Sequence, residues 1–176
     1  MTYISTITSP LGPIHLASDG TALTGLWLEG QKYFAATLPA GAQARPDLPV
    51  FRQTAEWLDA YFAKRPLPAL PPLAPQGSPF RQAVWKLLLD IPYGETATYG
   101  ALAQALRAHG ISAAAQAVGG AVGHNPISIL IPCHRCVGAD GSLTGYAGGI
   151  DKKRFLLELE GADLTGLYTP KRGTAL

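Results

Sequence analysis

The stretch SILIPCHRCVG, residues 128–138, contains both cysteines of this 176-residue chain. Cys133 and Cys136 stand in a C-x-x-C spacing, with His134 and Arg135 between them. Such a pair can be a redox dithiol, part of a metal site, two apolar core side chains, or one reactive thiol beside an incidental neighbour. The surrounding residues help to choose among these possibilities.

The sequence around the pair gives little support to a redox or zinc site. A redox C-x-x-C motif usually opens a helix, whereas Cys136 is followed by the turn-rich segment VGADGSLTG. A structural zinc site usually has a second ligand pair at regular spacing, which is missing here. Burial as small core side chains is a common fate of free cysteines, and composition alone favours it.

The position of Cys133 favours a reactive thiol. SILIP predicts a buried strand that ends at Pro132, so Cys133 should lie where a strand passes into a loop. The adjacent imidazole of His134 can accept the thiol proton directly or through a water molecule. A carboxylate usually orients such a base.

Composition and charge set the class of protein. Hydrophobic residues make up 47% of the chain and charged residues 15%, which is typical of globular domains. The formal net charge of +2 is only a weak indication of an anionic partner. The beginning MTYISTITSPLG has no basic or apolar signal segment, and no apolar run reaches the roughly 18 residues of a membrane span. We therefore expect a cytoplasmic protein without a membrane partner.

Residues 1–65 have the pattern of a small α/β domain. YISTITS, PIHLAS and LTGLWLEG predict three strands, the first two joined by a hairpin turn at SPLG. VFRQTAEWLDAYFAKR, residues 50–65, predicts an amphipathic helix. Six of the fifteen prolines lie in residues 66–79, so we expect a linker at 66–77 and a domain boundary there.

Residues 78–170 predict a mainly helical domain, followed by a tail at 171–176. Ser78, Thr98 and Ser112 are candidate N-caps for three helices, and a last helix begins at Asp151 and ends before Gly161. The helices YGALAQALRAHG and AAAQAVGGAVGHN are short and joined by a tight turn that contains glycine. This pair predicts a helix-turn-helix.

Several motifs of this second part, taken in order, resemble one family. NPISILIPCHRCVGADGSLTGYAGGIDKKRFLLELEG looks like the active-site region of the O6-alkylguanine-DNA alkyltransferases. SPFRQAVWKLLLDIPYGETATYGALAQAL resembles the start of their C-terminal domain, and QAVGGAVGHNP resembles their recognition helix. The resemblance is dense over residues 78–161. It implies a ribonuclease H-like N-terminal domain, which residues 1–65 match only by pattern.

The resemblance implies irreversible, single-turnover transfer of an alkyl group from guanine O6 to Cys133, without a metal or an organic cofactor. It makes His134 the base, acting through a water molecule, and Glu160 the carboxylate that orients it. Asn125 ties the recognition helix to the active-site segment, and Tyr99 donates a proton to the departing guanine. The resemblance places five residues at the substrate: Tyr146, Ala147, Gly148, Lys153 and Cys136, the last through its backbone carbonyl.

The resemblance also implies a partner, double-stranded DNA that carries O6-alkylguanine. The family lays the recognition helix in the minor groove and flips the damaged base out of the stack. We expect these residues at the DNA: Ala114, Ala115, Gln116, Ala117, Gly119, Gly120 and Arg135. Small residues let a backbone approach DNA closely, although tight packing between helices would also favour them.

This chain departs from the family at Gln116, where an arginine normally enters the base stack. Glutamine lacks the charge and the planar fork of guanidinium. We expect a monomer that repairs DNA. The alternative is a non-catalytic protein that recognises alkylated bases, although the presence of Cys133 argues against it, and a redox sensor that uses both cysteines is a third hypothesis.

Overall fold

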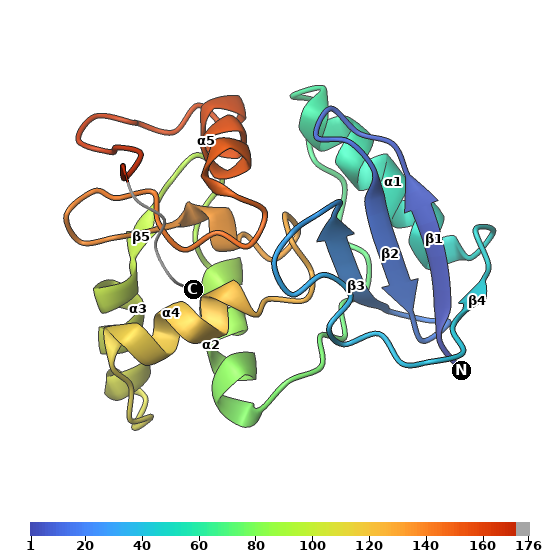
Figure 1. Cartoon of the computed structure of the whole chain (residues 1–176), viewed down its shortest axis with the longest axis horizontal. Coiled ribbons are helices and arrows are strands. Elements are labelled where there is room, and N and C mark those ends of the chain that lie inside the picture. The colour runs from blue at the N-terminus through green and yellow to red at the C-terminus, as the bar shows by residue number, and fades with distance from the viewer. Residues whose placement is uncertain (172–176) are drawn as a thin grey trace. The chain divides into compact units, whose positions relative to one another are not determined.

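The computed structural model describes residues 1–171, and these divide into two compact units (Figure 1). The first comprises Met1–Gln76 together with Pro126–Leu130, and the second comprises Gly77–Asn125 and the residues from Ile131 onward. The predicted sheet-containing N-terminal part and helical C-terminal part are confirmed. Of the predicted tail, residues 172–176 lie outside the described residues.

The first unit is a four-stranded sheet covered by one helix on a face (Figure 1). The strand order is β3 (Leu23–Leu28), β2 (Ile14–Ser18), β1 (Tyr3–Ile7) and β4 (Gln43–Ala44). The three long strands pair antiparallel, as their alternating sequences predict, and the short β4 pairs parallel with β1. Helix α1 (Pro49–Phe62) buries its apolar stripe, which includes Phe51, Trp57, Leu58 and Tyr61.

The free edge of β3 is covered by two segments that are distant in sequence. Leu23 N–H donates to Pro72 O at 2.8 Å, so the proline-rich segment runs along the sheet. Leu26 N–H donates to Pro126 O at 2.8 Å, and Ser128 N–H donates to Leu26 O at 3.0 Å. Because an exposed strand edge invites pairing with other chains, this cover protects the sheet.

The second unit is built on four helices and one short parallel pair of strands. The helices are α2 (Pro79–Leu89), α3 (Tyr99–Ala108), α4 (Ala115–Gly123) and α5 (Ile150–Leu159), and the strands are β5 (Ala97–Thr98) and β6 (Cys136–Val137). Helices α2 and α4 are joined by a hydrogen bond from Trp85 Nε1 to Ala121 O at 2.9 Å. No helix within residues 1–171 is long and apolar enough to cross a membrane.

Two of the three predicted N-caps are confirmed. The Ser78 hydroxyl accepts from Arg81 N–H and the Thr98 hydroxyl accepts from Ala101 N–H. The third prediction, Ser112, is wrong, because α4 begins at Ala115 without any side-chain cap. Since α3 and α4 pack against each other, the arrangement is compatible with the predicted helix-turn-helix, which stays a prediction.

The predicted strand SILIP is also wrong. Leu130 N–H donates to Ser128 O at 2.8 Å around Ile129, whose φ of 70° is rare for a β-branched residue. Cys133 N–H donates to Ile131 O at 2.8 Å around Pro132, with φ −82° and ψ 63°. Two successive three-residue turns therefore deliver the chain to Cys133, in place of an extended strand.

Candidate functional site

Cys133 opens a short 3₁₀ helix, η1 (Cys133–Arg135), directly after these turns. Its side chain is buried, with 4% exposure, and both cysteines are free thiols. The tight turn holds three consecutive polar or reactive side chains, Cys133, His134 and Arg135, inside the second unit. The thiol of Cys133 and the imidazole of His134, which we predicted to act together, therefore lie on one 3₁₀ turn.

Asn125 supports Cys133 from the end of α4. Its Nδ2 donates to Ile131 O at 2.8 Å, which closes the chain around residues 126–130. Burial raises the pKa of the Cys133 thiol, and a hydrogen bond from the Asn125 side chain and the charge of Lys153 oppose that rise. At neutral pH the thiol therefore keeps its proton, and nucleophilic use of this sulfur requires a base.

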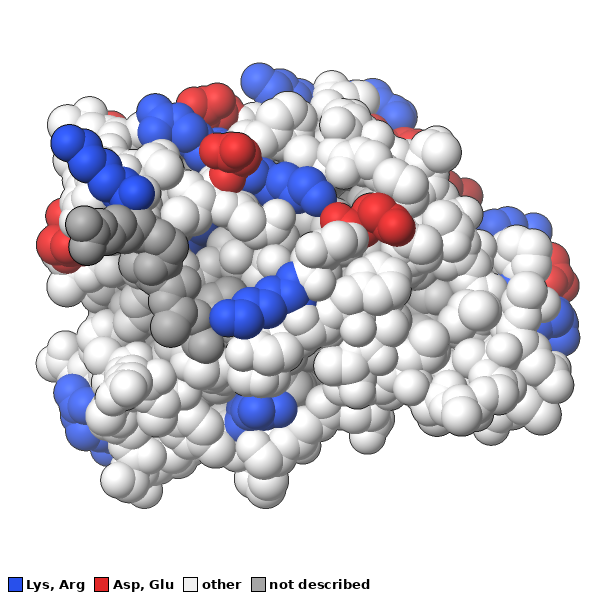
Figure 2. Space-filling model, viewed as in Figure 1, with Lys and Arg blue, Asp and Glu red and all other residues white. Residues whose placement is uncertain are grey.

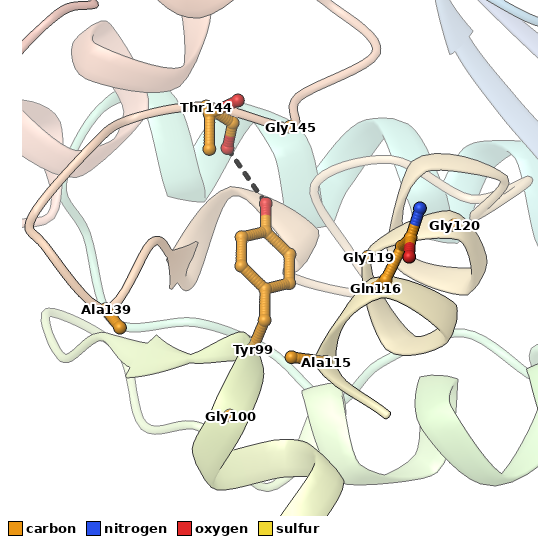
Figure 3. A pocket seen from close by; sticks show the side chains of 9 residues that line it. All are labelled: Tyr99, Gly100, Ala115, Gln116, Gly119, Gly120, Ala139, Thr144 and Gly145. Atoms are coloured by element: carbon orange, nitrogen blue, oxygen red, sulfur yellow. Dashed lines mark hydrogen bonds between the residues drawn. The ribbon is translucent and has the colours of Figure 1, made fainter. Parts of the chain in front are cut away.

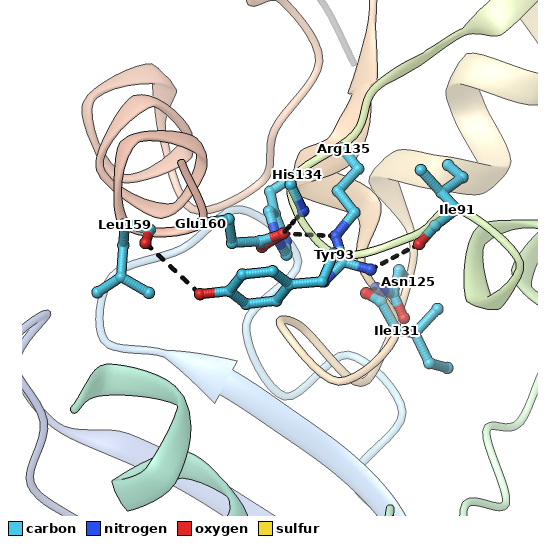
Figure 4. A network of polar contacts seen from close by, with 9 residues as sticks. Ile91, Tyr93, Asn125, Ile131, His134, Arg135, Leu159 and Glu160 are labelled. Carbon is cyan, nitrogen blue, oxygen red and sulfur yellow. Dashed lines mark hydrogen bonds and ion pairs between the residues drawn. The ribbon is translucent and has the colours of Figure 1, made fainter. Parts of the chain in front are cut away.

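The buried pair of His134 and Glu160 supplies such a base (Figure 4). His134 Nε2 donates to Glu160 Oε2 at 2.5 Å. Burial alone would raise the pKa of Glu160, but its bonds to His134 and Arg135 outweigh burial and hold that pKa at about 2. Burial lowers the pKa of His134 despite the neighbouring carboxylate. A neutral imidazole that donates through Nε2 has its lone pair on Nδ1, so Nδ1 is the basic atom.

Arg135 lies in the same network and not with the small-residue helix. Its Nε donates to Glu160 Oε1 at 2.7 Å, and its Nη1 donates to Ile91 O at 2.7 Å. Its guanidinium carbon lies 5.7 Å from the centre of the Tyr93 ring. The residue expected at DNA is thus 8% exposed and engaged inside the unit.

Lys153 is fully buried and connects two backbone segments. Its Nζ donates to Cys136 O and, at 2.8 Å, to Thr144 O. Burial lowers the pKa of Lys153 to about 8. The Cys136 carbonyl that was expected to receive guanine therefore already accepts a lysine bond, and burial raises the pKa of the Cys136 thiol to about 12.

A pocket of about 560 Å³ opens beside Tyr99 (Figure 3). It is lined by Tyr99, Gly100, Ala115, Gln116, Gly119, Gly120, Ala139, Thr144 and Gly145. The Tyr99 hydroxyl donates to Thr144 O at 2.8 Å, and burial raises the pKa of Tyr99 strongly. The pocket thus joins the predicted proton donor to the predicted DNA-binding helix, whereas Cys133 does not line it.

The remaining substrate candidates lie on the loop that precedes α5. Tyr146 is buried, and its ring centre lies 6.5 Å from that of His134 in an edge-on arrangement. Ala147 and Gly148 are partly buried and do not line the pocket. The sequence did not single out Thr144, whose carbonyl binds both Tyr99 and Lys153.

Packing inside the unit accounts for some small residues of α4, such as the buried Ala121 and Gly123, but not for all of them. Ala114, Ala115, Gln116 and Ala117 are exposed. A Cβ built on Gly120 would meet nothing within 4 Å, and one on Gly119 would reach only Tyr99 Cδ1 at 3.9 Å. Glycine inside a helix costs about 0.5–1 kcal/mol relative to alanine. The alternative explanation of tight helix packing therefore fails at these two glycines, which favours close approach of a partner.

Charge points to the same face. Residues 96–139 contain no Asp or Glu, a feature that the sequence alone could have shown. In the view of Figure 2, no acidic side chain lies over α3 and α4, and the sequences of these two helices contain one Lys or Arg, Arg107. A surface free of carboxylates does not repel an anionic partner.

Two family models together match nearly the whole described chain. The "6-O-methylguanine DNA methyltransferase, ribonuclease-like domain" matches residues 2–75, and the "6-O-methylguanine DNA methyltransferase, DNA binding domain" matches residues 79–162. The chain belongs to the 6-O-methylguanine DNA methyltransferase family.

Relatives of the 6-O-methylguanine DNA methyltransferase family match the chain over nearly its full length. A methylated-DNA–protein-cysteine methyltransferase of Mycobacterium tuberculosis is 48% identical over 169 residues, which cover 94% of this chain and 98% of the relative. The crystal structure of Mycobacterium tuberculosis OGT in complex with DNA has a TM-score of 0.80 at 46% identity, covering 90% of this chain and 92% of that chain. A 6-O-methylguanine DNA methyltransferase structure from Methanococcus jannaschii has a TM-score of 0.64 at 27% identity, covering 98% of this chain and 100% of that chain.

The geometry bears on the other hypotheses for the cysteine pair. Within residues 1–171, no group of three or more His, Cys, Asp or Glu side chains could hold a metal ion. Burial raises the pKa of both thiols, but Cys133 adjoins the hydrogen-bonded pair of His134 and Glu160, whereas Cys136 begins β6 and its carbonyl accepts from Lys153. The two cysteines therefore differ in their surroundings, and the assignment of one nucleophile and one core residue stays a prediction.

Proposed function

We propose that this protein repairs O6-alkylguanine in DNA by irreversible transfer of the alkyl group to Cys133, once per molecule. The observation that carries the proposal is the buried thiol of Cys133 beside the His134–Glu160 pair, in a chain of this family. In the step, the bond between guanine O6 and the alkyl carbon breaks as the sulfur–carbon bond forms. The electron pair stays on guanine, which takes up one proton.

His134 removes the thiol proton through Nδ1, by way of a water molecule. Among the described residues, Nδ1 has no hydrogen-bond partner, and Nε2 is committed to Glu160. The charge of Lys153 and the amide of Asn125 stabilise the thiolate that forms. Both groups lower the pKa of the Cys133 thiol and so oppose the effect of burial, which disfavours a charged sulfur.

Tyr99 gives the proton to the departing guanine. Its hydroxyl donates to Thr144 O, so a base that enters the pocket must take the place of that carbonyl. Lys153 also donates to Thr144 O, so it too would exchange that carbonyl for the bound base. Tyr146, Ala147 and Gly148 provide the wall of the alkyl site, and the Cys136 carbonyl binds the base with its second lone pair.

The DNA partner is a duplex bound through its minor groove. Glycines with open space around them and exposed alanines on α4 allow the helix backbone to come close to the bases. Gln116 lies exposed at the pocket, where it can fill the gap left by a flipped base. We propose a monomer in a reducing cytoplasm, where a free Cys133 stays reactive.

The test is intact-mass measurement after mixing the protein with a duplex that contains O6-methylguanine. The mass should rise by one methyl group, and peptide mapping should place it on Cys133. Cys133→Ser should abolish the gain, and Cys136→Ser should keep it. Methyl on Cys136 would overturn the assignment, and damage-specific binding without any mass gain would support a non-catalytic recognition protein.

A further inference from the structure

The carboxylate of Glu160 is the meeting point of several segments (Figure 4). Oε2 accepts from His134 Nε2 at 2.5 Å, and Oε1 accepts from Arg135 Nε at 2.7 Å and from Gly94 N at 3.2 Å. The two oxygens thus have different partners, one catalytic and one structural. His134 and Glu160 side chains are completely buried, and that of Arg135 is 9% exposed.

Arg135 is itself held from a third segment. Its Nη1 donates to Ile91 O, and its guanidinium faces the Tyr93 ring. Ile91 and Tyr93 belong to the loop between α2 and β5, so the guanidinium spans from that loop to the end of α5. A planar fork anchored at both ends has little freedom to turn, and it fixes the oxygen that it binds.

We propose that Arg135 is a positioning residue for alkyl transfer, which acts through Glu160 and sets the orientation and charge of the carboxylate that holds His134. The inference rests on the proposed function of Cys133 as acceptor. Guanidinium only donates, so Glu160 Oε1 must accept and Oε2 is left for the imidazole. The proton of His134 then stays on Nε2, and Nδ1 stays basic.

The charges around the pair determine the expected pH dependence. The titratable and charged groups that face Glu160 and His134 are Arg135, Lys153, Tyr93 and Cys133. Burial raises the pKa of Glu160 and is overcome by partners that include Arg135, whose charge also helps to lower the pKa of His134. Without Arg135 both groups should take up protons at higher pH, and neutral His134 should be lost earlier on acidification.

The experiment compares Arg135→Met with Arg135→Lys in single-turnover transfer from an O6-methylguanine duplex, from neutral pH downward. Loss of a charge-assisted hydrogen bond predicts that Arg135→Met slows transfer by about ten- to hundredfold and moves the acid limb to higher pH. Arg135→Lys keeps the charge but loses the planar fork of guanidinium. Its transfer should be slower than that of the wild type, and its acid limb should shift less than that of Arg135→Met. In a Glu160→Gln background, Arg135→Met should change the rate by less than about twofold.

Arg154→Met is the matched control, because Arg154 pairs with Glu158 at 3.1 Å on the exposed side of the same helix. Its rate and pH profile should equal those of the wild type. An unshifted acid limb in Arg135→Met, or an undiminished loss in the Glu160→Gln background, would reduce Arg135 to a packing residue. Weakened DNA binding as the sole effect would make it a DNA contact.

A second readout separates this inference from the proposed function. The rate at which iodoacetamide alkylates Cys133, followed by peptide mass spectrometry, reports the same thiol without DNA. If the wild type takes no methyl from the duplex, the proposed function fails. The alkylation rate is measured as a function of pH. A shift of this pH profile to higher pH in Arg135→Met would still support the positioning role, and an unchanged profile would overturn it. Arg135→Lys serves if the methionine variant does not fold.

Discussion

Glu160 shows how a buried charge is tolerated at the scale of one residue. An unpartnered carboxylate in the interior would take up a proton, because burial raises its pKa. Here His134, Arg135 and a backbone N–H all donate to it, and its pKa stays at about 2. The ion pair of Arg135 with Glu160 and the hydrogen bond of His134 with Glu160 therefore share one carboxylate. Removing any one of these side chains should alter the interactions of the others.

This has a consequence for stability in acid. The pKa of Glu160 is lower in the folded protein than in the unfolded chain, so the unfolded state binds more protons between about pH 4.5 and pH 2. The free energy of unfolding should fall as pH falls through that window. The lowered pKa of His134 acts in the same direction, beginning below about pH 6.5.

Urea unfolding at a series of pH values tests the prediction. Glu160→Gln should be less stable than the wild type at neutral pH, and it should lose less further stability between about pH 4.5 and pH 2. Glu158→Gln is a fair comparison, since Glu158 pairs only at the exposed surface of the same helix. If Glu160→Gln loses as much stability in that window as the wild type, other carboxylates control acid unfolding.

Single residues also show what sequence could foretell. Cys133, His134 and Glu160 were proposed as one site from motif and resemblance, and in the structure His134, the neighbour of Cys133 in the chain, is hydrogen-bonded to Glu160. The burial of Arg135 and Lys153 was not foreseen. Long cationic side chains are usually exposed, and these two are held inside by carbonyl partners that no local pattern announces, Ile91 for Arg135 and Cys136 for Lys153.

At the scale of elements, regular periodicity was predictive and short apolar runs were not. The helices followed from their apolar spacing and from caps such as Ser78 and Thr98. SILIP has the composition of a buried strand, but its residues are buried in turns, one of which places Ile129 at positive φ. A segment of five residues has too little periodicity to distinguish a buried strand from buried turns. Its backbone partner, Leu26 on β3, is also distant in sequence.

Helix α4 allows a substitution with opposite effects on stability and function. Gly120 has open space at its Cβ position and no positive φ, so Gly120→Ala should stabilise the protein by about 0.5–1 kcal/mol. In the proposed mode of binding the added methyl group would stand where DNA approaches, and we expect duplex affinity to fall by about tenfold. Thermal unfolding and fluorescence anisotropy measure the two effects.

The reaction with a small benzylated guanine controls for damage to the catalytic groups, because that substrate needs no groove. Its rate should be unchanged in Gly120→Ala. A variant that is more stable and binds DNA as well as the wild type would show that the glycine has no role in approach to DNA.

The same helix carries the departure at Gln116. Its side chain is exposed at the pocket, so a longer residue meets no obstacle inside the protein. Arginine would add stacking on bases and attraction to the negative groove, and base extrusion costs a few kcal/mol. Gln116→Arg should therefore speed repair of duplex DNA and leave the rate with benzylated guanine unchanged. An equal gain on both substrates would place the effect outside base flipping.

For the whole molecule, composition and pattern foretold the sheet-containing part and the helical part, whereas the proline-rich stretch up to Gln76 belongs to the first unit. They did not foretell that residues 126–130, enclosed by the second unit in sequence, belong to the first unit. That assignment depends on pairing with the edge of β3, which no local signal in residues 126–130 announces. Long-range pairing is the information that a single sequence carries least visibly.

Charge distribution over the whole molecule leads to a prediction about DNA binding. The net charge is only +2, and Arg135 and Lys153 are buried, so neither can meet a phosphate. Arg107 already donates to Ala113 O at 2.7 Å through one of its nitrogens. The α3–α4 face therefore excludes carboxylates but supplies few cations, and under the proposed mode of binding close contact through small residues provides much of the affinity.

Each neutralised phosphate lowers the slope of log affinity against log salt by about 0.9. A face with so few cations should meet no more than about three phosphates, so binding to undamaged duplex should follow a slope of about −3 or shallower, compared with proteins that make six or more contacts. Anisotropy titrations across a range of salt concentrations measure it. Arg107→Gln should reduce the slope by about one if Arg107 meets a phosphate, while Arg154→Met, on α5, should leave it unchanged. A wild-type slope of about −6 or steeper would contradict the prediction, because it would require cations that the described surface of α3 and α4 does not offer.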